Sequence, residues 1–393
     1  MLYRRFGRTE LQMPVFSCGG MRYQFKWRDR PRWRVPRESQ RNVEATIRRA
    51  FELGVNHFET ARGYGTSEMQ LGGVLPNLPR DEIIVQTKIA PTADPREFEK
   101  TFKMSLAYLK LDCVDLLSLH GINTPELEEQ SMRPGGCLEA ARAIQSSGRA
   151  RHIGFSTHGR PDRVLRLVES GRFDYVNLHW YYIHQVNWPA IEAARRLDMG
   201  VFIISPSDKG GRLYRPSERL VELCRPLSPM VFNDLFCLSR PEVGTLSIGA
   251  ARPGDFDEHL KALELIDRAD ELLPPIVERL QRAMTDKLGD DWVQTWSEGL
   301  PYYKDTPGEV NVPVILWLRN LALAYDMMEY GQARYNLLGR GGHWWPGEQW
   351  SKAEGRDLTA CLAASPHAEK IPALLAEADR MLAGCPVDRL MDD

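Results

Sequence analysis

The sequence is poor in the features that mark secreted, metal-binding and membrane proteins. Its 393 residues contain seven scattered cysteines, and no two of them form a CxxC pair. An odd number of cysteines without such pairs argues against a disulfide framework and against a zinc site. No stretch approaches the roughly 18 apolar residues of a membrane span, and the segment MLYRRFGRTE lacks the apolar core of a secretory leader. These absences predict a cytoplasmic protein with reduced thiols and no membrane partner.

The chain also lacks an excess of charge of either sign. The 51 basic and 53 acidic residues leave a net charge of -2, which argues against general attraction to nucleic acid. One local exception is residues 22–41, where eight Lys or Arg residues oppose two acids and alternate with Tyr23, Phe25, Trp27 and Trp33. This segment either receives an anionic or aromatic substrate or is a solvated loop, and no second basic stripe accompanies it.

No GxGxxG follows the first apolar segment, which weakens the case for a Rossmann fold. Short apolar runs instead alternate with amphipathic stretches, the rhythm of βα units around a parallel sheet. Eight such units in about 250 residues predict an α/β (β/α)8 TIM barrel, with residues 2–13 as a hairpin outside it. An open doubly wound sheet remains the alternative. The expected strands are 14–20, 55–60, 82–89, 113–120, 150–157, 174–180, 200–206 and 244–250.

After about residue 267 the rhythm changes to long helical stretches separated by Pro- and Gly-bearing loops. Six of the ten tryptophans lie beyond this point, so this part is expected to pack as a folded unit. The sequence therefore predicts a barrel domain over 1–267 and an all-helical C-terminal appendage over 268–393.

Polar residues stand at the ends of three neighbouring expected strands. They are Glu59, with Tyr64 just beyond it, Lys88 and His120. Any one of them alone is more often an ordinary surface residue, but TIM-barrel chemistry is built at the C-terminal strand ends. Together they suit proton transfer: Lys88 would lower the pKa of Tyr64, Glu59 would hold Lys88, and His120 would orient a carbonyl.

The motifs around these residues resemble three signatures of the aldo-keto reductases, (β/α)8 enzymes that reduce carbonyls with NADPH. They are GVNHFETARGYGTSEMQLGGVL, IIVQTKI and DLLSLH, and similarity continues through GFSTH, YVNLHW, SPSDKGGRL and SIGAARPGDFDEHLKAL, so it covers residues 1–267. The resemblance assigns the family's catalytic tetrad to Tyr64, Lys88, His120 and Glu59, with Tyr64 as general acid. The family normally has Asp where this chain has Glu59, so the longer side chain must fold back to reach Lys88.

The resemblance also implies a site for NADPH. Ser156 and Asn177 would hold the nicotinamide, with Ser205 beneath it, and His158 would take a place where other members have Asn. Without the resemblance, the pair Gly210 and Gly211 would indicate only a turn. The choice of NADP over NAD depends mainly on Arg252. The other implied contacts are Gly20, Met21 and Arg22 after the first strand, Lys209, Gly210 and Gly211 at the pyrophosphate, Arg252 at a 2'-phosphate, and Glu258 and His259 at the adenine.

Within this family the chain is most similar to the group whose barrel precedes a helical, ferredoxin-like domain with CxxCxxCxxxCP runs that ligate iron–sulfur clusters. Aligning those runs on Pro301 and Pro366 places only one cysteine, Cys361, among eight ligand positions. We therefore expect a degenerate domain without an iron–sulfur cluster. The ligand positions are Asp290, Val293, Trp296 and Leu300, and Gly355, Leu358, Cys361 and Ser365.

The predicted function is NADPH-dependent reduction of an aldehyde or ketone to an alcohol. The alternative is a non-catalytic protein that binds a nucleotide or a partner on the same scaffold. The sequence identifies neither the carbonyl substrate nor the oligomeric state.

Overall fold

The structure is a computed structural model that describes residues 1–384. The chain forms two compact units, one of residues 1–210 and 233–269, the other of residues 211–232 and those from 270 onward. The sequence predicts a single division after residue 267, whereas the compact units also separate residues 211–232 from their flanking segments. Six of the seven cysteines have free thiols, and the seventh, Cys385, lies outside the described residues.

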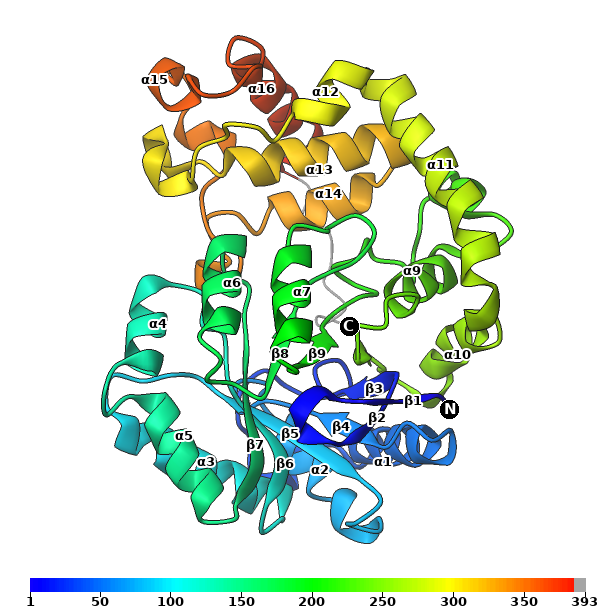
Figure 1. Ribbon diagram of the computed structural model, residues 1–393, viewed down its shortest axis with the longest axis vertical. Helices are drawn as coiled ribbons and strands as arrows, with labels where there is room; N and C mark the ends of the chain where they lie inside the picture. The colour runs from blue at the N-terminus through cyan, green and yellow to red at the C-terminus, as the bar shows by residue number, and fades with distance from the viewer. Residues whose placement is uncertain (385–393) are drawn as a thin grey trace. The chain divides into compact units, whose positions relative to one another are not determined.

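The first unit contains a closed barrel of eight parallel strands in the order β10-β3-β4-β5-β6-β7-β8-β9 (Figure 1). The predicted (β/α)8 TIM barrel is therefore confirmed. Nearly all strand residues are buried, as expected for a parallel sheet whose outer face is covered by helices. The strands are β3 (Phe16–Gly19), β4 (His57–Glu59), β5 (Ile84–Ile89), β6 (Val114–Leu119), β7 (Ala150–Ser156), β8 (Tyr175–Leu178), β9 (Gly200–Ile203) and β10 (Thr245–Ile248).

The N-terminal hairpin outside the barrel is also confirmed. Its strands β1 (Tyr3–Arg5) and β2 (Gln12–Pro14) pair antiparallel, and Phe6 between them is fully buried. A Cβ atom at Gly200 or Gly244, where β9 and β10 begin, would lie 2.6 or 2.7 Å from the Phe6 ring. Phe6 therefore closes the N-terminal end of the barrel with apolar surface, and the polar end is the C-terminal one.

Helices alternate with the barrel strands and bury one face each. In α3, Asp94 caps the helix by accepting a hydrogen bond from the backbone N–H of Arg96 at 3.0 Å, and Phe98 and Phe102, four residues apart, are fully buried. The helices from α1 to α10, apart from α8, are α1 (Arg37–Glu52), α2 (Ser67–Leu71), α3 (Pro95–Leu109), α4 (Pro125–Met132), α5 (Cys137–Ser146), α6 (Pro161–Glu169), α7 (Trp188–Arg196), α9 (Pro229–Leu238) and α10 (Asp257–Leu263).

The second unit has no strand within residues 211–232 and 270–384, in agreement with the predicted helical appendage. Ten of the fourteen residues of α13 (Val312–Tyr325) are buried, because α14 and α16 pack against it. The other helices beyond the barrel are α8 (Glu218–Cys224), α11 (Ala269–Leu288), α12 (Asp290–Thr295), α14 (Met328–Tyr335), α15 (Thr359–Leu362) and α16 (Ile371–Leu382). Short 3-10 helices elsewhere are η1 (Gly7–Thr9), η2 (Arg32–Arg34), η3 (Leu75–Asn77), η4 (Pro253–Phe256), η5 (Ile266–Arg268), η6 (Tyr303–Asp305), η7 (Pro307–Glu309), η8 (Gly342–Trp344) and η9 (Trp350–Lys352).

The two segments aligned with cluster-ligating runs lie side by side in the second unit. The ring centroids of Trp292 and His367 are 4.9 Å apart, and Thr295 Oγ1 lies 2.8 Å from His367 Nε2. Gly299 packs so closely on the backbone carbonyl of Ala364 that no side chain fits there. An indole, an imidazole and backbone therefore fill the contact between these segments.

Candidate active site

The four residues of the tetrad meet at the C-terminal end of the barrel. Glu59 is the last residue of β4, Lys88 lies in β5, His120 directly follows β6, and Tyr64 lies in the turn between β4 and α2. Glu59, Lys88 and His120 are 4%, 1% and 8% exposed, whereas Tyr64 is half-buried. Neighbouring parallel strands thus bring the predicted groups to one edge, where TIM-barrel sites are built.

The longer carboxylate of Glu59 does reach Lys88. Lys88 Nζ donates to Glu59 Oε2 and also, at 2.9 Å, to the carbonyl oxygen of Thr60. The second oxygen, Oε1, accepts a hydrogen bond from Ser247 Oγ on β10 at 2.8 Å. Both carboxylate oxygens are therefore satisfied inside the barrel, as a buried charge requires.

A glycine makes room for this arrangement. Gly19 on β3 lies beside Glu59 in the strand register. A Cβ atom at Gly19 would stand 2.6 Å from Ser247 Oγ and 3.1 Å from Glu59 Oε1. The absence of a side chain at residue 19 therefore leaves the Glu59 carboxylate and its serine partner the space they occupy.

The Tyr64 ring contacts two other members of the tetrad. Its centroid lies 5.7 Å from that of His120 in an edge-to-face arrangement, and Lys88 Nζ lies 5.1 Å from the same centroid. The structure therefore brings all four predicted residues into one cluster.

Desolvation raises the pKa of Tyr64 well above its ordinary value, and the negative charge of Glu59 raises it further. The sequence predicts the opposite direction, with Lys88 lowering this pKa. The physical reason is that desolvation of the phenol dominates and the Glu59 carboxylate, which lies beside the ring as the partner of Lys88, adds to the increase. Tyr64 is consequently a neutral phenol with a proton to donate throughout the neutral pH range.

Unsatisfied polar atoms lie where the nicotinamide was predicted. Asn177 on β8 is fully buried and stands opposite Ser156 on β7, and within residues 1–384 neither its Oδ1 nor its Nδ2 has a hydrogen-bond partner. Ser156 Oγ accepts a hydrogen bond from the backbone N–H of Gly121 at 3.0 Å. Ser205 has a φ of 54°, a left-handed conformation that costs a non-glycine residue about 1–3 kcal/mol and is frequent at ligand sites.

A lysine and two histidines adjoin this place. Lys209 Nζ lies 2.9 Å from His158 Nδ1 and 3.2 Å from His179 Nε2, and the two imidazole centroids are 4.3 Å apart. Burial and the charge of Lys209 lower the pKa of His179 well below its ordinary value, so its imidazole is neutral. The sequence prediction includes His158 and Lys209 but misses His179, whose available signal is its position two residues after Asn177.

The loops after β3 and β10 are joined at the barrel mouth. Gly20 N donates to the carbonyl oxygen of Glu59 at 2.8 Å, and a Cβ at Gly20 would lie 2.7 Å from that oxygen. Arg22 Nη1 donates to the carbonyl oxygen of Gly249 at 2.6 Å, and Met21 between them is half-buried. Of these three predicted cofactor residues, Gly20 thus contacts the tetrad residue Glu59, and Arg22 links the loops after β3 and β10.

The residues predicted for the adenine end of the cofactor differ in burial and in their present partners. His259 is 3% exposed, and its Nδ1 lies 2.5 Å from Asp234 Oδ2, so this imidazole is a buried group that the structure does not present to a base. Arg252 is exposed and pairs with Asp255 at 3.0 Å, while Glu258 pairs with Lys261 at 2.6 Å.

The predicted glycine pair is divided between the two units. Gly210 belongs to the first unit and packs directly on the carbonyl of Pro206, which leaves no space for a side chain. Gly211 is the first residue of the second unit, so its predicted contact with a pyrophosphate stays a prediction.

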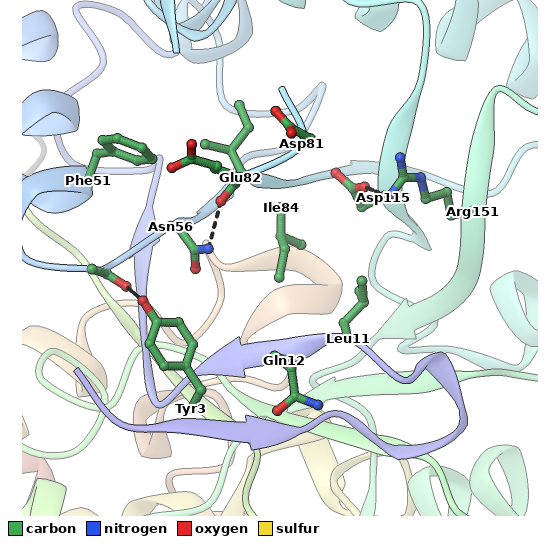
Figure 2. A pocket seen from close by; sticks show the side chains of 12 residues that line it. Tyr3, Leu11, Gln12, Phe51, Asn56, Asp81, Glu82, Ile84, Asp115 and Arg151 are labelled. Carbon is green, nitrogen blue, oxygen red and sulfur yellow. Dashed lines mark hydrogen bonds and ion pairs between the residues drawn. The ribbon is translucent and has the colours of Figure 1, made fainter. Parts of the chain in front are cut away.

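A pocket of about 490 Å³ lies where the strands begin, away from the tetrad (Figure 2). Its buried carboxylate, Asp115, is paired with Arg80 at 2.9 Å and with Arg151 at 3.0 Å. TIM barrels use this end for stability. The lining includes none of the predicted site residues and consists of Tyr3, Leu11, Gln12, Phe51, Gly54, Asn56, Asp81, Glu82, Ile83, Ile84, Asp115 and Arg151.

Within residues 1–384, no group of three or more His, Cys, Asp or Glu side chains is arranged to hold a metal ion. No helix in the same range is long and apolar enough to cross a membrane.

The fold and the cluster together define a (β/α)8-barrel protein with a tyrosine, lysine, histidine and carboxylate at its C-terminal mouth. Residues 17–218, just over half of the chain, match the model described as the Aldo/keto reductase family. The chain belongs to the aldo/keto reductase family.

Individual relatives match over shorter lengths. The chain is 30% identical over 187 residues to L-glyceraldehyde 3-phosphate reductase of Escherichia coli (strain K12), covering 43% of this chain and 49% of that protein. It is 33% identical over 151 residues to L-galactose dehydrogenase of Arabidopsis thaliana, covering 35% and 46%. The chain thus spans about half the length of these curated relatives.

Solved structures show the fold at lower identity. The holo form of an aldo-keto reductase from Bacillus halodurans superposes with a TM-score of 0.56 and 19% identity, covering 69% of this chain and 96% of that one. Structural similarity at this sequence identity supports only the assignment of the barrel fold.

Proposed function

We propose that the protein is an oxidoreductase that reduces an aldehyde or ketone to an alcohol with NADPH. The observation that carries this proposal is the tetrad itself, in which Lys88 and Glu59 form a buried ion pair beside the ring of the half-buried Tyr64. Membership of the aldo/keto reductase family supports it.

In this reaction Tyr64 is the general acid. Its raised pKa keeps the phenol protonated, so the hydroxyl can donate a proton to the carbonyl oxygen as negative charge develops there. His120 lies edge-on to Tyr64 and orients that oxygen from the other side. Lys88, held by Glu59, stabilises the phenolate that remains after proton donation. NADPH, when bound, supplies the hydride.

The residues present fit the nicotinamide end of this cofactor. Asn177 offers one buried donor and one buried acceptor without partners in residues 1–384, the complement of a carboxamide. Ser156 adjoins it in the register, and Ser205 holds the strained conformation expected beneath a ligand. At the other end Arg252 remains our proposal for the 2'-phosphate and Gly210 for the pyrophosphate turn, whereas the buried His259 is not proposed for the adenine.

The C-terminal part is proposed to be a ferredoxin-like domain that has lost its clusters. The packing of Trp292 against His367 supports this idea, because this ring contact and the hydrogen bond between Thr295 and His367 occupy the junction of the two segments. Purified protein should contain no stoichiometric iron and no visible absorption when it is prepared without oxygen. Stoichiometric iron with sulfide would refute this proposal.

The decisive test compares Tyr64→Phe with the wild-type protein. NADPH binding, followed by fluorescence, should stay within about twofold, while kcat/KM for benzaldehyde should fall by about 10²–10⁴. Tyr3→Phe, at the opposite barrel end, is the matched control and should leave both unchanged. Turnover that survives Tyr64→Phe would refute the mechanism. Binding of NADPH without any turnover would favour the non-catalytic alternative.

A further inference from the structure

Residues 22–31, in the loop between β3 and η2, are hydrogen-bonded to the turn that carries Tyr64. Phe25 N donates to Thr66 Oγ1 at 3.0 Å and to Gln70 Oε1 at 2.9 Å. In return Thr66 N donates to the carbonyl oxygen of Lys26 at 3.0 Å. Backbone hydrogen bonds of this kind fix the loop's position relative to the catalytic tyrosine.

Arg62 provides a second attachment for the same loop. Arg62, only 11% exposed, forms ion pairs with Asp29 of the loop and with the fully buried Glu68, and its guanidinium lies 4.6 Å from the Tyr108 ring. Gly65 lies directly against the loop backbone, leaving no space for a Cβ atom. The loop is therefore held by charge, hydrogen bonds and close backbone contact.

These contacts place Trp27 against the tetrad. The Trp27 and Tyr64 ring centroids are 6.1 Å apart with an interplanar angle of 77°, an edge-to-face contact. Trp27 Nε1 is buried from solvent, and no hydrogen-bond acceptor for it occurs within residues 1–384. A buried donor without an acceptor costs free energy, so its retention next to a reacting group requires an explanation.

We propose that Trp27 is a specificity-determining residue whose indole N–H binds an oxygen atom adjacent to the carbonyl that is reduced. The preferred substrates would then be vicinal dicarbonyls and 2-oxo acids, which carry such an oxygen, rather than simple aldehydes and ketones. This inference rests on the proposed reductase function and on the same site. A substrate without the second oxygen leaves the indole donor unpaired, and sites built on a polar contact discriminate strongly against such analogues.

The test uses 2,3-butanedione and 2-butanone, which have the same carbon chain and differ in one oxygen. For each we would measure kcat/KM, and also binding to the NADP⁺-loaded protein by ligand-observed NMR. Trp27→Phe keeps an aromatic ring against Tyr64 but removes the N–H. We expect the ratio of dione to ketone to fall roughly tenfold in both measurements.

Trp33→Phe is the matched control, because Trp33 lies close by in the sequence but is 77% exposed. Its ratios should stay within about twofold of the wild type. Unchanged ratios in Trp27→Phe would overturn the inference, since a merely packing role does not distinguish the two ligands. If neither protein turns over either ligand but the ratio of dione to ketone binding falls in Trp27→Phe, the inference is supported and the proposed reductase function is refuted.

Discussion

Removing the charge of Glu59 should destabilise the barrel and change the titration of Tyr64. In Glu59→Gln the Lys88 ammonium, which is 1% exposed, would lose the carboxylate with which it forms an ion pair. Breaking a buried ion pair from one side costs about 3–5 kcal/mol because an uncompensated charge remains. At about 2–4 °C per kcal/mol, thermal unfolding should shift down by roughly 6–20 °C.

The same substitution should move the pH dependence of the reaction. The negative charge of Glu59 raises the pKa of Tyr64, so removing it beside Lys88 lowers that pKa. Reduction requires the protonated phenol, and the alkaline decline of kcat/KM should therefore begin at a lower pH in Glu59→Gln than in the wild type.

The assay is thermal unfolding of the wild type, Glu59→Gln and the double variant Glu59→Gln/Lys88→Met. The double variant should recover most of the lost stability, because neither charge is left buried, and should stay inactive. Glu278→Gln breaks an exposed pair with Arg282 and should cost less than about 1 kcal/mol. If Glu59→Gln costs no more than this control, the ion pair does not close as the structure indicates and the reasoning is refuted.

Two further predictions concern residues beneath and beside the tetrad. Burial and the charge of Lys88 lower the pKa of His57 to about 3. Because an unfolded histidine titrates near 6.5, the contribution of the neutral His57 to stability is present above pH 6.5 and is lost as the pH falls toward 3. His57→Gln should therefore flatten the decline of the urea midpoint between pH 7 and pH 4. An unchanged decline would show that other groups control acid unfolding. Gly65 has a φ of 52° and no space for a Cβ atom, so Gly65→Ala should displace the loop of residues 22–31 and raise KM for carbonyl substrates. Gly171 has a φ of 65° but nothing within 4 Å of a Cβ atom, so Gly171→Ala should leave KM unchanged. Equal effects of the two alanines on KM would contradict this explanation.

The fold could be predicted because its signals are local and repeated. Eight apolar runs separated by amphipathic helices specify a (β/α)8 barrel, and the barrel topology alone brings the ends of β4, β5 and β6 together. Glu59, Lys88 and His120 could therefore be predicted as neighbours from their positions at strand ends. Tyr64 followed from its place in the turn after Glu59.

The features of the site that could not be predicted depend on the direction in which side chains point and on contacts between residues far apart in the sequence. His259 was predicted to face a ligand, but residue type does not tell which face of α10 it occupies, and Asp234 holds it in the interior. The direction of the Tyr64 pKa was predicted from Lys88 alone, because the sequence does not show how strongly folding desolvates the phenol. His179 was missed because its contact with Lys209 joins residues 30 positions apart.

The exchange of Asp for Glu at residue 59 is best understood as part of a set of three residues on adjacent strands. Glu59 on β4 faces Gly19 on β3 and accepts from Ser247 on β10, 188 positions away in sequence. The longer side chain spans the distance from Ser247 to Lys88, and it does so only because Gly19 carries no side chain. The Glu59 carboxylate therefore forms its ion pair with Lys88 through one oxygen and accepts a buried hydrogen bond from Ser247 through the other, and the two contacts together fix its orientation.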